Sequence, residues 1–274
     1  MHKFLRAIGF SDITKKDLEM ILDEVITRPE IMKITKDSEG NEFAELSGSF
    51  AANAGITVRG TYQEDDSFHM DYYYPYVFGT SITTNEQIDV EKHAEKESYA
   101  GVCDEVNLGV TLIFYIQNVA DYLAETNRHL SKIHYGAMLA GLSTEGKILC
   151  PVVERKKNDV PAIQKNDRHN QLIAQAREGD EDAIESLTLE DMDTYALLSQ
   201  RVMKEDIFSI VKSTFMPFGI ESDQYTVLGE IIDCVTMENK LTHEKLYGMK
   251  LLCNNIQFDV CINEKDLLGE PAIG

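Results

Sequence analysis

The sequence predicts an α+β protein in which an antiparallel sheet with helices precedes a small C-terminal β domain. Strand-like patterns recur in residues 31–153 and again from residue 206, whereas the pattern between them is helical. We therefore expect an α+β domain over residues 1–155, a helical linker segment over residues 156–205 and a β domain over residues 206–274. A barrel-like closure of that last domain is one arrangement that its short strands allow.

The first predicted element is a helix that begins after Thr14. Thr14 and Asp17 have the spacing of a capping box, with Asp in place of the usual Glu. Apolar residues then recur at helical spacing and give the helix one apolar face, formed by Leu18, Ile21, Leu22 and Val25. Pro29 ends the helix. The segment Ile31–Lys36 follows as a strand, and a second strand starts at Phe43 after a turn.

The best-defined local feature is a hairpin in which the strand Ile56–Tyr62 turns through a polar loop into Phe68–Phe78. If Tyr62 pairs with Phe68, one face of the second strand carries an aromatic row. We interpret this row as core, because an exposed row of that length would be a large apolar patch, and its members are Phe68, Met70, Tyr72, Tyr74, Tyr76 and Phe78. Pro75 indicates that this strand lies at a sheet edge or contains a bulge.

The opposite face of this hairpin carries the candidate site residues. The same pairing places Arg59 opposite Asp71. The face also presents a histidine and a tyrosine, so that its members are Arg59, His69, Asp71 and Tyr73. These four residues could form an acid/base or binding cluster, while an ion pair in solvent between neighbouring strands is the commoner arrangement. We take these four residues as the candidate binding face and assign no catalytic residue.

The rest of the first domain alternates polar segments with short apolar ones. Residues 80–106 are rich in charge and predict a surface helix with loops. We expect a buried strand at Val110–Ile116, a helix near residues 118–132, and a second hairpin formed by Ala137–Ser143 and Ile148–Val153.

The second half of the chain changes from helical patterns to strands. Ala162–Arg177 is predicted as a helix, with Gly179 as its C-terminal signal. Four strands are expected after residue 205, at Ile207–Phe215, Tyr225–Thr236, Leu246–Cys253 and Ile256–Ile262. The pair Asn254-Asn255 predicts a tight turn, because asparagine tolerates a positive φ.

The charge of the chain excludes several classes of partner. The 274 residues include 26 Lys and Arg against 47 Asp and Glu, a net charge of −21 at pH 7. Such a surface repels phosphate backbones and anionic lipids, so we expect no nucleic acid and no membrane as partners. The most apolar stretch, Val110–Ile116, is far shorter than the ~20 residues of a membrane helix. The N-terminus lacks the pattern of a signal peptide.

No motif for chemistry is complete in this sequence. Its five cysteines form no Cys-x-x-Cys pair and indicate reduced thiols, as expected of a cytoplasmic protein. Phosphate-binding loops and the Gly-x-Ser-x-Gly nucleophile elbow are missing from the sequence. His93 and Glu97 have the spacing of one helix face, but two ligands do not make a metal site. We therefore expect no metal and no cofactor.

Several segments resemble a known family. They lie at Arg6–Phe10, Gly179–Tyr195, Phe215–Tyr225 and Cys261–Pro271. Together they are similar to an uncharacterised protein family of clostridial Firmicutes, a domain of unknown function, over nearly the full length. The resemblance implies a cytoplasmic bacterial protein and assigns no catalytic residue. It also implies that relatives continue with a further basic strand, so that the C-terminal sheet here would lack its closing strand.

Three functions stay open at this point. The leading hypothesis is a non-catalytic binding or regulatory protein that takes a protein or small-molecule partner on a sheet face or in a cleft. The second is a hydrolase-like enzyme with dispersed site residues in the N-terminal domain, near His69 and Asp71, or in the cleft between domains. The third is a structural subunit of a homo-oligomer held by an apolar interface.

Overall fold

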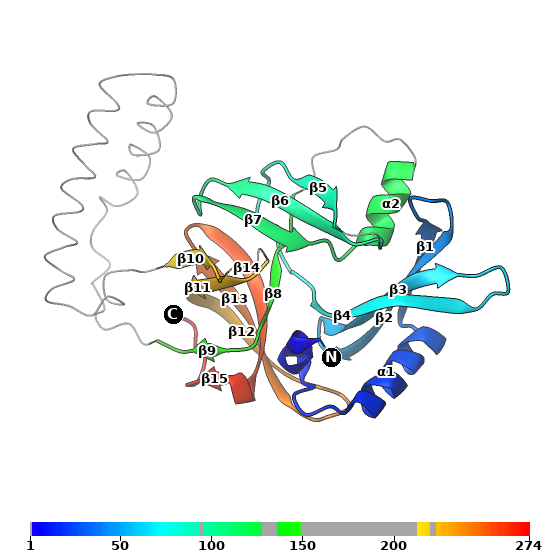
Figure 1. Cartoon of the computed structure of the whole chain (residues 1–274). Helices are drawn as coiled ribbons and strands as arrows, with labels where there is room; N and C mark the ends of the chain where they lie inside the picture. The colour runs from blue at the N-terminus through cyan, green and yellow to red at the C-terminus, as the bar shows by residue number, and fades with distance from the viewer. Residues whose placement is uncertain (1, 94–95, 128–135, 150–212, 220–222) are drawn as a thin grey trace, which may run out of the picture. The chain divides into compact units, whose positions relative to one another are not determined.

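The computed structural model describes residues 2–93, 96–127, 136–149, 213–219 and 223–274 (Figure 1), and every structural statement below concerns these residues. Residues 1–148 and 213–274 form one compact unit. The predicted helical segment 156–205 lies outside the described residues. The α+β class is confirmed for the described part, which is built mainly from antiparallel sheets.

The N-terminal sheet is an antiparallel meander of four strands in the order β1-β2-β3-β4. Their bounds are β1 Ile31–Lys36, β2 Glu42–Ala51, β3 Ala54–Tyr62 and β4 Phe68–Val77. Helix α1 (Lys15–Thr27) precedes them, and its predicted capping box is confirmed because the Thr14 side chain accepts from the Asp17 N–H while Asp17 reaches back. The predicted strand at Ile31–Lys36 is also confirmed.

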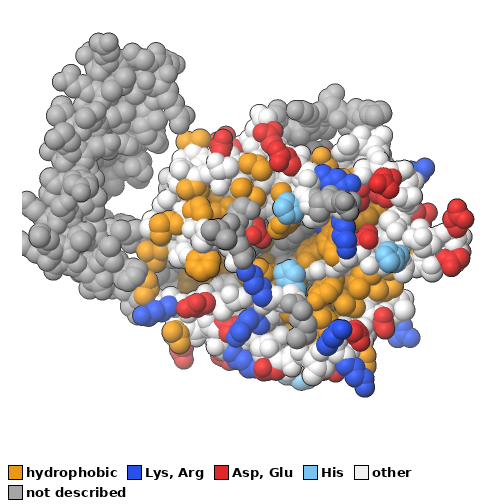
Figure 2. All heavy atoms as spheres, viewed as in Figure 1, with side chains coloured by type: hydrophobic (Ala, Val, Ile, Leu, Met, Phe, Trp, Pro, Cys, Tyr) orange, Lys and Arg blue, Asp and Glu red, His pale blue; other side chains and the backbone are white. Residues whose placement is uncertain are grey.

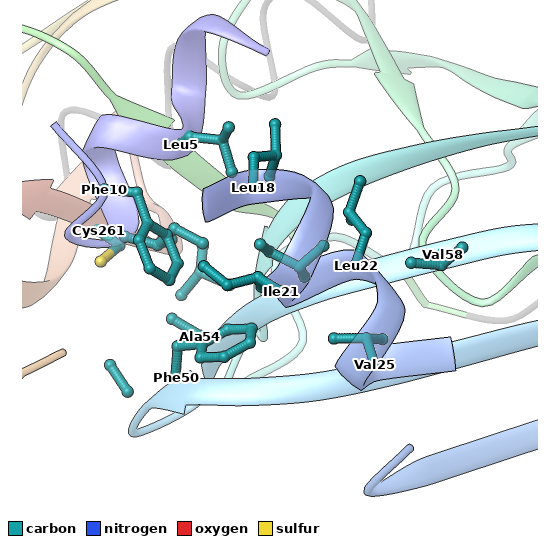
Figure 3. Packing of buried hydrophobic residues seen from close by; sticks show 14 of the residues in the cluster. Leu5, Phe10, Leu18, Ile21, Leu22, Val25, Phe50, Ala54, Val58 and Cys261 are labelled. Carbon is teal, nitrogen blue, oxygen red and sulfur yellow. The ribbon is translucent and has the colours of Figure 1, made fainter. Parts of the chain in front are cut away.

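The main core lies between α1 and one face of this sheet (Figure 3). The apolar face of α1 is buried there as the sequence predicted, through Leu18, Ile21, Leu22 and Val25. It packs on Leu46, Ile56 and Val58, which are fully buried. Burying a side chain of this size stabilises the fold by ~1.5–3 kcal/mol relative to leaving it exposed, so this layer positions the sheet firmly.

A bulge in β4 changes the predicted register of the hairpin. Tyr62 pairs with Phe68 as expected, but Arg59 pairs with Tyr72 while Gly60 pairs with Met70, which leaves Asp71 without a partner residue. The predicted pairing of Arg59 with Asp71 is therefore wrong. The bulge also divides the aromatic row, because Phe68 packs on the α1 side.

Beyond the bulge, the tyrosines of the row turn to the opposite face of the sheet. Tyr72 and Tyr74 contact Arg59 there, and Tyr76 is 2% exposed. Two members of the predicted row are not core, since Met70 and Phe78 are 38% and 42% exposed. The edge position expected from Pro75 is confirmed, whereas the bulge lies at Asp71 and Pro75 itself pairs regularly with Ile56.

A second layer covers this opposite face. It consists of a three-stranded sheet, β5 (Asp89–Lys92), β6 (Tyr99–Glu105) and β7 (Val110–Tyr115), followed by α2 (Val119–Asn127). Val119, Ala120 and Leu123 of α2 pack on Phe43 of β2. The surface helix predicted within residues 80–106 is wrong, because β5 and β6 form in this range and β6 pairs with β7 and buries alternate residues. The strand predicted at Val110–Ile116 is confirmed as β7, but its predicted burial is wrong, because only Leu112 in it is buried.

The C-terminal strands form an open sheet in the order β12-β13-β14-β8. Its strands are β12 Glu230–Glu238, β13 Lys245–Cys253, β14 Ile256–Asn263 and β8 Ala140–Ser143, and β8 runs parallel to β14. The described strands close no barrel. The hairpin predicted at Ala137–Val153 is not formed in the described part, since β8 pairs with β14 and β9 (Gly146–Lys147) pairs with β15 (Leu267–Leu268).

Smaller elements complete the C-terminal region. The predicted long strand Tyr225–Thr236 is divided at Gly229 into β11 (Tyr225–Leu228) and β12, and β11 pairs with β10 (Thr214–Pro217). The tight turn is confirmed, with φ of 45° at Asn254 and 69° at Asn255. The short helix η2 (Glu264–Asp266) follows β14.

The short helix η1 (Lys3–Ile8) joins the two larger sheets. Leu5 and Ile8 are buried in the core that α1 covers. The side-chain amide of Asn263 donates to the Arg6 carbonyl at 3.0 Å, and that of Asn239 donates to the Ile8 carbonyl at 2.7 Å. Residues 213–274 therefore form one compact unit with residues 1–148.

Candidate functional site at the free edge of strand β1

The structure does not bring the four sequence-predicted site residues together. Arg59 is 3% exposed and points to the face that α2 covers. Tyr73 lies opposite Val58 on the α1 side, and its hydroxyl accepts the His2 backbone N–H at 3.3 Å. His69 is exposed and Asp71 lies in the bulge, and no hydrogen bond joins these two among the described residues.

Arg59 instead forms a buried polar network with residues that sequence reasoning did not connect to it. Its Nε donates to the Glu45 carboxylate at 2.9 Å. The two Nη atoms donate to the hydroxyls of Tyr72 at 2.9 Å and Tyr74 at 2.7 Å, and Nη2 also donates to the Gln117 carbonyl at 2.8 Å. Every arm of the guanidinium is thus occupied by protein.

The network anchors the first turn of α2 to the sheet. Glu45 is 6% exposed and accepts the backbone N–H of Ala120, while Arg59 holds the chain just before the helix. Burial raises the pKa of Glu45, and Arg59 and Ala120 offset this in part. Because Arg59 and Glu45 are buried and the hydrogen-bond partners of Arg59 are internal, this network fixes α2 to the sheet.

A second polar cluster has the residue types of a Ser–Lys catalytic dyad, but its lysine is in the wrong protonation state to act as a base. Lys265 Nζ donates to Ser11 Oγ at 2.8 Å, and Ser11 Oγ donates to Glu244 at 2.5 Å. A lysine that activates a serine must be neutral. Hydrogen bonds to Glu244 and Asp12 raise the pKa of Lys265, so the ammonium stays protonated. The cluster holds η1 and its following turn to the C-terminal sheet.

The described residues form neither a metal site nor a membrane-spanning helix. His93 and Glu97 share no helix face, since both lie between the strands β5 and β6 and neither is helical. No group of three or more His, Cys, Asp or Glu in the described part of the chain is arranged to hold a metal ion. Nor does any described helix combine the length and the apolar character that a membrane crossing requires.

The edges of the larger sheets differ in how they are protected against added strands. Edge strands expose unpaired N–H and C=O groups, and proteins blunt them with proline, bulges, short length or covering groups. Strand β4 has Pro75 and the bulge, and β5 and β8 are four residues long. In β12 a bulge follows Ile231, whose carbonyl accepts the Gly274 N–H. The Tyr225 hydroxyl binds both the N–H and the C=O of Ile113 in β7.

Strand β1 contains no proline and no bulge, and no described side chain binds its backbone between Ile31 and Thr35. It is six residues long, and among the described strands it pairs with β2 alone. Ile31, Met32 and Ile34 are 44%, 49% and 48% exposed. Met32 and Ile34 lie on the α1 face beside Leu46 and Ala44, whereas Ile31 is on the other face. The edge therefore offers apolar side chains above and below its free backbone groups.

The lysines of β1 do not close this edge. Lysine on an edge strand usually discourages pairing. Here Lys33 Nζ donates to Asp121 of α2 at 2.6 Å, which directs this side chain onto the helix. The Lys36 carbonyl accepts the side-chain amide of Asn127 at 2.9 Å, so α2 binds one end of the strand, while in the described structure the backbone of Ile31–Thr35 is hydrogen-bonded to β2 alone.

An open groove adjoins the same strand. Its volume is about 480 Å³, and its lining residues are Ile34, Thr35, Lys36, Gly40, Glu42, Ala124 and Asn127. The groove lies between the β1–β2 turn and α2, the helix that Arg59 and Glu45 hold in place. The sequence predicted β1 as a strand but not as a free edge, because edge position depends on the order of strands in the sheet.

Comparison with known proteins gives one match. The model of the family described as "Domain of unknown function, E. rectale Gene description (DUF3881)" covers residues 5–274. This match confirms the resemblance to an uncharacterised family of clostridial Firmicutes. No curated protein and no solved structure matches the chain.

Proposed function

This chain belongs to the DUF3881 family, and we propose that it is a non-catalytic binding protein that takes an extended segment of a partner protein along β1. The observation that carries the proposal is the contrast between β1 and the other edges of the larger described sheets. A partner segment in extended conformation would satisfy the outward backbone groups of β1 and cover its apolar side chains, as in other cases of strand addition.

The energetics favour a transient complex. Fully burying a large apolar side chain is worth ~1.5–3 kcal/mol, and each of the three exposed ones on β1 is already about half covered. Their burial would therefore contribute about 3 kcal/mol together. That gain is smaller than the ~4–15 kcal/mol that association costs, so backbone hydrogen bonds and the groove must supply the rest. A regulatory interaction fits this balance better than a permanent one.

Selection from a library of short linear peptides tests the proposal directly. Affinities of the selected peptides are measured by calorimetry for the full chain and for two variants. Ile34→Lys places a charge on the proposed edge and should weaken binding by about tenfold or more, which is ~1.4 kcal/mol or more. Val235→Lys is the matched control, because Val235 is 53% exposed on the edge strand β12. Peptides that bind Ile34→Lys as well as the unchanged chain would sink the proposal.

The two alternative functions have less support from the geometry. The hydrolase-like hypothesis relied on His69 and Asp71, and no hydrogen bond joins these two residues in the described structure. A homo-oligomer could form through the same free edge, by pairing of two β1 strands. The variant Ile34→Lys distinguishes this case, since it would then change the oligomeric state rather than the affinity for a peptide.

We also propose a cytoplasmic location for the protein. The support is that Cys103, Cys234, Cys253 and Cys261 are free thiols, as expected in a reducing compartment. The fifth cysteine, Cys150, lies outside the described residues. Labelling of cell fractions with an antibody against the chain checks this location, and recovery from the culture medium would contradict it.

A further inference from the structure

The partner segment at β1 has a recognisable chemistry, and this inference rests on the proposed function. We infer that the segment is basic, with Lys or Arg residues alternating with apolar ones. Two features favour a basic segment, namely the local charge at the edge of β1 and the electrostatic field of the whole chain.

The local part concerns helix α2, which runs alongside β1 in the same direction. Asp121 of α2 pairs with Lys33, and six residues later Asn127 binds Lys36. Six helical residues span ~9 Å, and three strand residues span ~10 Å, so α2 and β1 advance by about the same distance between these two contacts. The α2 side of an added strand would therefore run past Asp121.

The carboxylate of Asp121 can serve a second cation. Its side chain is 47% exposed, and its one ion pair in the described structure is with Lys33. A carboxylate has about four acceptor positions, so a Lys or Arg of the added strand can share it without displacing Lys33. An acidic residue at that position of the partner would instead meet a carboxylate of the same charge.

Side chains on the other face of the added strand meet a different surface. Met32 and Ile34 project there, next to the covered residues Leu46 and Ala44. Because side chains of a strand alternate between faces, a basic residue toward α2 places its two neighbours on this apolar face. The complementary segment is therefore one in which Lys or Arg alternates with large apolar residues.

The second part is the long-range field. Near β1 itself acidic side chains are in excess, since residues 28–42 and 119–127 hold six acidic and three basic side chains. The chain as a whole carries −21, and acidic side chains are scattered over the visible face rather than gathered in one patch (Figure 2). A field of this sign speeds the arrival of basic segments and slows acidic ones.

The test compares three synthetic peptides that differ only in their polar positions. They alternate Ile with Lys, Ile with Thr, or Ile with Glu, and their affinities for the full chain are measured by calorimetry at low and at moderate salt. We expect the Lys peptide to bind about tenfold tighter than the Thr peptide, with an advantage that shrinks as salt rises. A fourth peptide with Pro at the Ile positions keeps the charge but cannot pair as a strand, and it should not bind.

The variant Asp121→Asn assigns the charge effect to this edge. It should weaken binding of the Lys peptide severalfold and leave the Thr peptide unchanged. Equal affinities of the Lys and Thr peptides would overturn the basic character of the segment while leaving strand addition intact. Failure of all the Ile-containing peptides to bind would overturn the proposed function itself. Binding of the Pro peptide would show attraction by net charge alone and would also count against β1.

Discussion

At the scale of single residues, the buried Arg59 determines what the second face of the N-terminal sheet can do. Its guanidinium holds Glu45, two tyrosine hydroxyls and the chain before α2. A buried charge whose hydrogen bonds all go to protein groups has a structural role, because none of its donors is left for a ligand. Through α2 it also sets the wall of the groove beside β1.

Replacement of Arg59 therefore tests stability rather than binding chemistry. Arg59→Met leaves the Glu45 carboxylate buried without its cation, and we expect it to lower the free energy of unfolding by ~3–5 kcal/mol. Urea unfolding followed by circular dichroism measures the change. The double variant Arg59→Met with Glu45→Gln should lose less than the single one, since no uncompensated charge remains. A single variant within ~1 kcal/mol of the unchanged chain would contradict this account.

Glu97 gives the molecule a defined response to acid. Burial would raise the pKa of this carboxyl, but hydrogen bonds from Lys92, Ser38 and Tyr99 outweigh burial and hold the pKa below its usual range. A carboxyl whose pKa is lower in the folded state stabilises the fold above its unfolded pKa and loses that contribution as pH falls through the folded value.

Unfolding at several pH values checks this sign. We expect the stability of the unchanged chain to fall between about pH 5 and about pH 3 more steeply than that of Glu97→Gln. Glu64→Gln, in the exposed turn between β3 and β4, is the control for loss of one negative charge. Parallel stability curves for the chain and Glu97→Gln would show that the contacts of Glu97 do not stabilise the carboxylate.

Single residues also mark where sequence reasoning reached its limit. The capping box of Thr14 and the positive φ of Asn254 were predictable because each follows from neighbours in the chain. The bulge at Asp71 was not, since the alternation of apolar residues continues through it on both sides. The sequence placed Arg59 on a candidate binding face opposite Asp71, but the bulge shifts the register so that Arg59 is buried opposite Tyr72.

At the scale of elements, α1 is the part of the fold that local sequence specifies best. We expect Thr14→Ala to lower the free energy of unfolding by ~0.5–2 kcal/mol, because the Asp17 N–H loses its acceptor. Thr27→Ala is the matched control at the other end of the helix, where the hydroxyl donates to the Asp23 carbonyl at 2.7 Å. This control should change the free energy of unfolding by less than ~0.5 kcal/mol. Equal effects of the two substitutions would argue against the cap.

Elements that depend on distant partners could not be predicted from the sequence. β8 pairs with β14, whose residues lie more than a hundred positions later in the chain, so the local pattern suggested a hairpin instead. The free edge of β1 has the same origin. Its sequence indicates a strand, but only the order β1-β2-β3-β4 shows that one side stays unpaired among the described strands.

At the scale of the whole molecule, the net charge opposes pairing of two copies through the free edge of β1. Two copies that each carry −21 repel one another, and this repulsion opposes pairing of two β1 strands. We expect sedimentation to show a monomer at about 0.01 M salt, where charges act over ~30 Å. Self-association would be expected to grow as salt screens the repulsion. A stable dimer at the lowest salt would favour the homo-oligomer instead.

Hydrogen exchange at the edge strands measures the central claim most directly. The full chain is exchanged with and without the peptide that alternates Ile with Lys, and protection of backbone amides is followed by mass spectrometry for β1 and, as internal comparisons, for β4 and β12. Strand addition predicts slower exchange in β1, with β4 and β12 unchanged. Protection that arises in β12 or β4, or binding without protection in β1, would contradict the account.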